Sequence, residues 1–315
     1  MLNYCWITKI QADWFLRKKL IQNYMKYTAL YFALTVILII TTASSTFAQD
    51  TVSVPDTLRG WDSSWQLGLN GSQASYSNWS QGGVNNIAAT GSTTFTSVYK
   101  KDRFSYGFLA NARFGKTKIE NEGVRKIDDR LFILNRFLYD LGEDESDFKL
   151  YANIRFRTQF DKGFNYGAEP KELISKFLAP AYFNQDAGLA YIPGPMFSFE
   201  AGLGLQQTIV IDSDLSAKYG LSDGDSFSIE PGITLGSTFN AAIAENLQLS
   251  SSINTFTNFG KPLKSTDIWF SNKLVASINR YLNTTFSLDF VYNDDFSDEI
   301  QVAQVLSVGV SFTLR

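Results

Sequence analysis

Apolar and polar residues alternate along most of the chain after residue 62. The pattern is clearest in residues 306–314, "LSVGVSFTL", where every even-numbered position is Leu, Val or Phe and every odd-numbered position is Ser, Gly or Thr. Successive side chains of a strand point to opposite faces. The segment is therefore predicted to be a strand with one face toward hydrocarbon and the other toward water or a polar interior.

The same alternation recurs in other long segments, namely 104–114, 148–160, 197–207, 227–239 and 284–292. Strands of soluble sandwiches average about five or six residues, whereas a tilted membrane-spanning strand needs about 9–11. Aromatic residues cluster near the segment ends, as in interfacial girdles. Strands in lipid must satisfy every backbone N–H and C=O, which only a closed barrel does. The pattern predicts an all-β fold, a transmembrane, antiparallel, up-and-down β-barrel.

The connections between these segments alternate in length. Five are short and polar: 100–103, 142–147, 192–195, 244–246 and 280–283. Six are longer: 74–85, 115–127, 161–182, 211–226, 260–267 and 293–299. Outer-membrane barrels have short periplasmic turns and longer outer loops. We therefore expect about twelve strands, with ten or fourteen as alternatives, and both termini in the periplasm. Within one long connection, the apolar spacing of 170–180 predicts a short amphipathic helix.

The N-terminal region has the pattern of a secretory signal peptide. Lys26 precedes the apolar run 29–43, and small residues lead to an exit at Ala48. Met25 opens this pattern and is the expected true start, the alternative being an unusually long basic region before the apolar run. The expected organisation is an upstream extension plus signal peptide, a short periplasmic segment and the barrel domain, at 1–48, 49–62 and 63–315.

The amino-acid composition argues against several classes of function. Cys5 is the only cysteine and lies before the expected cleavage point, and the chain has no histidine. Serine–histidine triads and histidine or cysteine metal sites are therefore excluded. No dinucleotide or phosphate-loop motif is found. The net charge of −3 argues against nucleic-acid binding. We expect no enzyme activity, no catalytic residue, no cofactor and no metal.

Most of the charged residues in the predicted strands fall on the inward-facing positions. The candidate lumen charges are Arg113, Arg155, Arg157, Glu200, Glu230 and Asp289, and Arg130, Arg136, Lys149 and Lys273 share their face. One interpretation is a charged constriction that selects solutes, with Arg155 and Arg157 binding an anion. The other is that these charges fill the lumen and pair with one another. The acidic stretch 291–300 is interpreted as a solvated loop, with divalent-cation binding as the alternative.

One uncharged stretch, "NWSQGGVNN" at 78–86, combines a tryptophan with a glycine pair and amide side chains. Glycines permit tight reversals, and asparagines satisfy backbone groups of turns. A catalytic role would need a base beside Ser80, and none can be named. The stretch is interpreted as a structured turn formed by Asn78, Trp79, Ser80, Gly82 and Gly83.

Three stretches carry a resemblance to a known family. "YSNWSQGGVNNIAA" at 76–89, "SKFLAPAYFNQDAGLAYIP" at 175–193 and "IWFSNKLVASINRYLNTTFSLDFVYNDD" at 268–295 occur in the order found in a Bacteroidetes outer-membrane family, domain of unknown function 3078 (DUF3078). Ala190 and Asn293 stand where acids are expected, and Arg315 stands where such barrels usually end in an aromatic residue. The resemblance implies an outer-membrane barrel, and it carries over no activity and no catalytic residue.

These observations together predict a barrel in the outer membrane of a Gram-negative bacterium. The expected function is that of a narrow or closed barrel with a structural or minor solute-passage role. The alternative is an outer-membrane enzyme or lipid-handling barrel with its site at the outer rim. The expected partners are outer-membrane lipid, lipopolysaccharide and the barrel-assembly machinery, with small solutes as candidate ligands.

Overall fold

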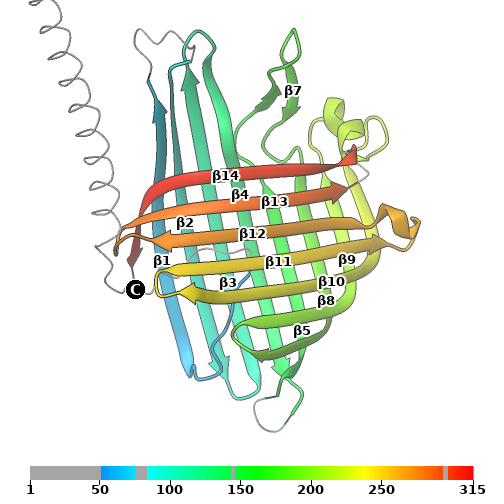
Figure 1. Ribbon diagram of the computed structural model, residues 1–315. Coiled ribbons are helices and arrows are strands. Elements are labelled where there is room, and N and C mark those ends of the chain that lie inside the picture. The colour runs from blue at the N-terminus through cyan, green and yellow to red at the C-terminus, as the bar shows by residue number, and fades with distance from the viewer. Residues whose placement is uncertain (1–50, 76–83, 143–145, 294–296, 315) are drawn as a thin grey trace, which may run out of the picture. The chain divides into compact units, whose positions relative to one another are not determined.

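A computed structural model describes residues 51–75, 84–142, 146–293 and 297–314. Twelve of the strands in these residues form one closed barrel (Figure 1), in the order β1-β14-β13-β12-β11-β10-β9-β8-β5-β4-β3-β2. They are β1 (Gly60–Ala74), β2 (Asn86–Lys101), β3 (Phe104–Ile119), β4 (Gly123–Asp140), β5 (Phe148–Thr158), β8 (Ala181–Gly194), β9 (Phe197–Ile209), β10 (Phe227–Ala244), β11 (Leu247–Asn258), β12 (Asp267–Ser277), β13 (Leu282–Asn293) and β14 (Ser297–Leu314). The predicted fold class and the preferred strand number are confirmed.

Every barrel strand pairs with its neighbours in the antiparallel sense. β1 and β2 pair along their whole length, from Gly60 opposite Lys100 to Ala74 opposite Asn86. The barrel closes where β14 pairs with β1, from Leu314 opposite Trp65 to Val308 opposite Gly71. β1 begins at Gly60, slightly ahead of the boundary expected at residue 63.

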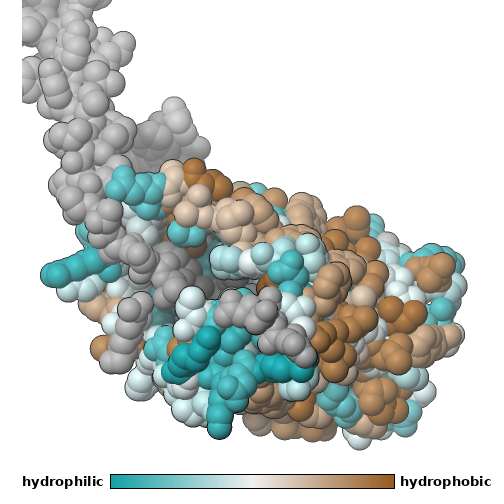
Figure 2. Space-filling model, turned by 90° about the horizontal axis from the view of Figure 1, so that it is seen from below, coloured by the Kyte–Doolittle hydropathy of each residue, from teal (hydrophilic) through white to brown (hydrophobic). Residues whose placement is uncertain are grey.

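The predicted alternation separates the two surfaces of the barrel wall. In β14, the side chains of Leu306, Val308, Phe312 and Leu314 are exposed on the outside, whereas Gly309 is buried. Figure 2 shows hydrophobic residues over much of the flank at the right and hydrophilic residues gathered near the lower edge. The outer surface therefore carries the apolar set. No helix among the described residues is long and apolar enough to cross a membrane.

Two of the predicted connections differ from the structure. The stretch 115–127 is not a long loop, because β3 and β4 continue through it and are joined by residues 120–122 alone. Asn121 and Gly123 adopt positive φ angles of 65° and 85° there, which permits the tight reversal. The charged residues of this stretch indicated a loop, but they lie on strands that extend the barrel wall.

The predicted helix at 170–180 is wrong. This region contains a two-stranded hairpin of β6 (Gly163–Asn165) and β7 (Glu172–Ser175), which Figure 1 shows at one end of the barrel. Leu173 packs against a small buried cluster of Ala179, Val210, Leu215 and Leu221. The apolar spacing thus serves this cluster and not a helix face. Two short 3-10 helices occur elsewhere, η1 (Ser213–Tyr219) and η2 (Leu263–Ser265).

Candidate functional site: the barrel lumen

Residues 51–59, here called the N-terminal segment, lie against the inner face of the barrel wall. Val52 is 5% exposed and belongs to a buried cluster with Val98, Leu109, Phe132 and Leu134 of β2, β3 and β4. Gly107 makes room for it, since a Cβ atom at Gly107 would lie 2.5 Å from Cγ1 of Val52. Burial of a valine side chain contributes roughly 1.5–3 kcal/mol. This apolar contact anchors the segment inside the lumen.

A cluster of four charged side chains holds the same segment near the short turns. Lys100 Nζ lies 2.7 Å from Asp56 Oδ1 and 3.5 Å from Asp140 Oδ2. Lys149 Nζ lies 3.4 Å from Asp56 Oδ1 and also forms an ion pair with Asp140. Lys100, Lys149 and Asp140 are nearly inaccessible to solvent. Each buried lysine therefore has two carboxylate partners, which offsets the loss of hydration.

The pKa of Asp56 reflects this cluster. Partial burial alone would raise the pKa, but the hydrogen bond from Lys100 and the charge of Lys149 outweigh it. The pKa of Asp56 is therefore held below its ordinary value of 3.8. The carboxylate stays ionised at neutral pH and keeps both lysines as partners.

A second layer of paired charges lies on the inner face of the neighbouring strands β4, β5, β8 and β9. Arg136 forms an ion pair with Glu200, and Arg155 forms one with Asp186. Asn153 links the two pairs, donating to Asp186 at 3.0 Å and to Glu200 at 3.2 Å. Arg155 and Glu200, both expected in the lumen, are thus engaged with neighbouring side chains. The geometry therefore supports the interpretation that these two lumen charges pair with other side chains.

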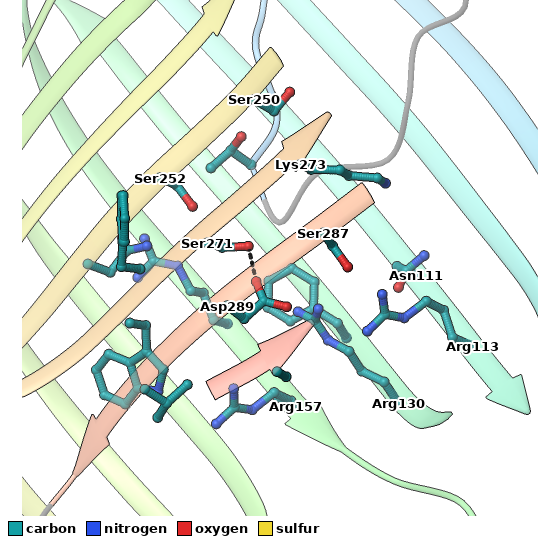
Figure 3. A pocket seen from close by; sticks show the side chains of 18 of the residues that line it. Asn111, Arg113, Arg130, Arg157, Ser250, Ser252, Ser271, Lys273, Ser287 and Asp289 are labelled. Atoms are coloured by element: carbon teal, nitrogen blue, oxygen red, sulfur yellow. Dashed lines mark hydrogen bonds between the residues drawn. The ribbon is translucent and has the colours of Figure 1, made fainter. Parts of the chain in front are cut away.

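A cavity of about 910 Å³ lies in the lumen, and Thr51 of the N-terminal segment contributes to its lining. Four arginines line it, and three of these, Arg113, Arg130 and Arg157, are labelled in Figure 3. Arg113 of β3 is directly opposite Arg130 of β4, and Arg157 of β5 is directly opposite Phe132. The Arg130 guanidinium carbon lies 4.7 Å from the Phe132 ring centroid. The same distance separates Arg157 from the ring of Tyr182. Aromatic faces thereby orient two of the guanidinium groups.

The opposite wall of the cavity is formed by β11, β12 and β13 and is rich in hydroxyl groups. Figure 3 shows Ser250, Ser252, Ser271 and Ser287 on this wall, with Lys273 beside them. Asp289 also lines the cavity, where it accepts a hydrogen bond from Ser271 Oγ.

The remaining predicted site residues are separate from the cavity. Glu230 does not line it. Instead it accepts a 2.7 Å hydrogen bond from Asn258 and lies 3.0 Å from Lys261 Nζ. The turn residues Asn78, Trp79, Ser80, Gly82 and Gly83, and part of the acidic stretch 291–300, lie outside the described residues. In the described part of the chain, no group of three or more Asp or Glu side chains could hold a metal ion.

Several residues that organise the lumen were not found from the sequence. Asp56 and Val52 precede the first strand, and Lys100, Asp140 and Asp186 lie near strand ends or in a weakly patterned strand. Val52 and Val54 are separated by a single serine, a two-residue period that was the one available signal for the N-terminal segment. Their contacts depend on residues far away in the sequence, so the local pattern could not reveal them.

Comparison with known proteins gives one family match and several likenesses to solved structures. An outer membrane channel from Pseudomonas putida F1 is 10% identical, with 84% of this chain and 99% of that chain covered and a TM-score of 0.40. The translocator domain of the autotransporter NalP from Neisseria meningitidis is 14% identical, with 82% and 90% covered and a TM-score of 0.36. The KdgM porin is 9% identical, with 80% and 99% covered and a TM-score of 0.32. At such low identity, no functional property of these proteins extends to this chain.

No match is found among curated proteins. The family model described as "Protein of unknown function (DUF3078)" matches residues 72–164. This range contains the first of the three stretches that carry the sequence resemblance, together with strands β2 to β5. The DUF3078 resemblance expected from the sequence is therefore confirmed over residues 72–164.

Proposed function

We propose that this protein is an outer-membrane β-barrel of a Gram-negative bacterium, whose lumen is narrowed by its own N-terminal segment. Its role is then structural, or limited to slow passage of small solutes. The observation that carries the proposal is the position of Val52 and Asp56, which contact inward-facing residues of the barrel wall. Cleavage after Ala48, as expected from the sequence, would leave two residues before Thr51.

The apolar outer surface supports membrane insertion. Leu306 of β14 is 69% exposed and pairs with Phe286 of β13, whereas the neighbouring Ser307 lines the cavity. We propose that the exposed apolar side chains meet lipid and that lipopolysaccharide surrounds the end with the longer loops. The barrel-assembly machinery would insert the chain, with both termini on the periplasmic side. The lack of histidine in the sequence supports a passive barrel over an enzyme.

Planar-bilayer recording tests the narrowed lumen. The protein starting at Gln49 is expected to give no large, steady conductance. A variant lacking residues 51–58 removes the Val52 and Asp56 contacts, and larger conductance steps are expected from it. A large, steady conductance before the deletion would contradict the proposal. An equally low conductance after it would show that other side chains close the lumen.

A matched pair of substitutions in β14 tests the membrane assignment. Leu306→Arg places a charge on the outer face and is expected to destabilise the folded barrel by about 2–4 kcal/mol. Ser307→Arg places the same charge in the cavity and is expected to have a much smaller effect. Heat-modifiable gel mobility and urea unfolding in vesicles measure both. Gly309 is unsuitable as the inward control, because a Cβ atom there would overlap the Asn70 side chain.

A further inference from the structure

The barrel closes through the shortest ladder of its described strands, here called the seam. β14 and β1 pair over seven residues of each strand, whereas every other ladder of the barrel spans ten or more. Both strands continue beyond the seam toward the longer loops, since β1 ends at Ala74 and β14 begins at Ser297. Figure 1 shows β14 running across the view and turning to follow β1 only near its C-terminal end.

The edge of β14 is open beyond the seam. The register would place Leu306 opposite Gln73, but the ladder ends one pair earlier, at Val308 and Gly71. Among the described residues, no strand pairs with this part of β14 on the side away from β13. An open sheet edge at membrane depth is tolerated only where it is buried in protein or lines a water-filled cavity. Ser307, next to Leu306, lines the cavity, so the cavity reaches the place where the wall separates.

Apolar side chains lie on both sides of the wall at this place. Val305 of β14 lines the cavity with 54% of its surface exposed, and Ala303 and Val291 line the cavity near it. On the outer face, Leu306 and Val308 are exposed. Because exposed apolar surface favours apolar contacts, a molecule with an apolar body can move past this edge without leaving apolar surroundings.

A hydrogen-bonding group lies beside the inner apolar surface. Asp289 of β13 is directly opposite Ala303 and lines the cavity. Its carboxylate accepts a hydrogen bond from Ser271 Oγ (Figure 3), and a carboxylate can accept several. A molecule that enters from the bilayer must be uncharged, because a charge in hydrocarbon is costly. An alcohol meets both conditions, since it is uncharged and its hydroxyl group can donate to Asp289.

We propose that the seam is a lateral passage through which small alcohols with an apolar body move between the bilayer and the cavity. The apolar body contacts Ala303 and Val305, and the hydroxyl group donates to Asp289. The cavity volume of about 910 Å³ lies in the range of small-molecule sites, about 300–1,000 Å³. The passage rests on the proposed membrane insertion of the barrel, but it does not depend on whether the N-terminal segment limits conductance.

Disulfide formation in lipid nanodiscs tests whether the seam is open. Two cysteine pairs are compared in a Cys5→Ser background. Leu69→Cys/Val310→Cys joins opposite residues of the ladder, and Gln73→Cys/Leu306→Cys lies just beyond it. Opposite residues of a ladder are within disulfide reach, so the first pair is expected to oxidise at least about tenfold faster than the second. Equal oxidation rates would overturn the open seam.

A maleimide that resides in the bilayer, N-dodecylmaleimide, tests lateral access to the cavity. Val305→Cys and Ser252→Cys both face the cavity, the first beside the seam and the second on β11. Relative to modification by a water-soluble maleimide, modification by N-dodecylmaleimide is expected to be at least about tenfold faster at Val305→Cys than at Ser252→Cys. Equal ratios at the two positions would overturn the lateral passage, whatever the conductance of the barrel.

Octanol is the probe for the ligand class. It is expected to slow modification of Val305→Cys by the water-soluble maleimide saturably, by at least about threefold, and to leave Ser252→Cys unchanged. Octane lacks the hydroxyl group and is expected to protect at least about twofold less, and Asp289→Ala should abolish this difference. Heat-modifiable gel mobility verifies folding of each variant. The assignment of an alcohol is overturned by no protection, by equal protection at both cysteines, or by equal protection from octanol and octane.

Discussion

Two regions of the lumen differ in how they accommodate inward-facing polar side chains. Near the short turns, Lys100, Lys149 and Asp140 are almost inaccessible, and the N-terminal segment supplies Asp56 as a further partner. Elsewhere in the lumen, charged and hydroxyl side chains line a cavity that extends to Asn283, beside the short turn before β13. The lumen therefore combines a packed region beside the N-terminal segment with a cavity lined by polar side chains.

The difference follows from side-chain size and from the path of the chain. Leu109, Phe132 and Leu134 point inward beside Val52 and exclude water there. On the far side of the cavity, β11 to β13 present serines, which cannot reach across the lumen. Charges in the packed region must be paired because their hydration is lost. Charges that line the cavity can keep part of their hydration.

The largest expected effect comes from removing one charge in the packed region. Lys149→Met leaves Asp140 buried with Lys100 as its one remaining basic partner in the cluster, and it should destabilise the barrel by roughly 3 kcal/mol. Lys273→Met removes the same charge from the cavity wall and should change stability by less than about 1 kcal/mol. Urea unfolding in lipid vesicles, followed by tryptophan fluorescence, compares the two. Equal effects would mean that the two regions do not differ in packing.

A smaller effect, on conductance, is expected when the pH is lowered. The folded pKa of Asp56 is below its ordinary value of 3.8, so its contribution to docking is complete above that value. This contribution is lost as the pH falls through the lowered folded pKa. The groups that face Asp56 are Lys100 and Lys149, with Asp140 behind them.

Conductance of the unaltered protein should therefore stay low from neutral pH down to about pH 4. An increase is expected only under more acidic conditions, and Asp56→Asn should reduce this pH dependence. Planar-bilayer recording across the range measures it. An opening transition near pH 6 would contradict the assignment of Asp56 as the acid-sensitive contact.

The strands were predictable because the information is local. Alternation of apolar and polar residues has a period of two, and a segment such as 306–314 displays it without reference to the rest of the chain. Loop boundaries were less predictable, since the charged residues between β3 and β4 continue the strands. The helix expected at 170–180 failed for a related reason, because Leu173 faces a cluster formed by distant residues.

The sequence predicted which charged residues face the lumen, but it did not predict their partners. Alternation placed Arg113, Arg155, Arg157 and Glu200 on the inner face, yet their partners depend on register across strands. Asp186 reaches Arg155 because Asn153 is opposite Asp186, a pairing fixed by the joining of β5 and β8 around the hairpin. The N-terminal segment was assigned to a short periplasmic region, since nothing in its own residues indicates contact with Gly107 or Lys149.

Thiol protection tests directly whether the N-terminal segment is docked inside the lumen. Val52→Cys and Ser53→Cys are compared in a Cys5→Ser background, which removes the one cysteine of the sequence. Val52 is buried and Ser53 is exposed. Modification by a water-soluble maleimide should be at least about tenfold slower at Val52→Cys than at Ser53→Cys in the folded barrel, and the rates should be equal after unfolding. Equal rates in the folded barrel would contradict the docking of this segment.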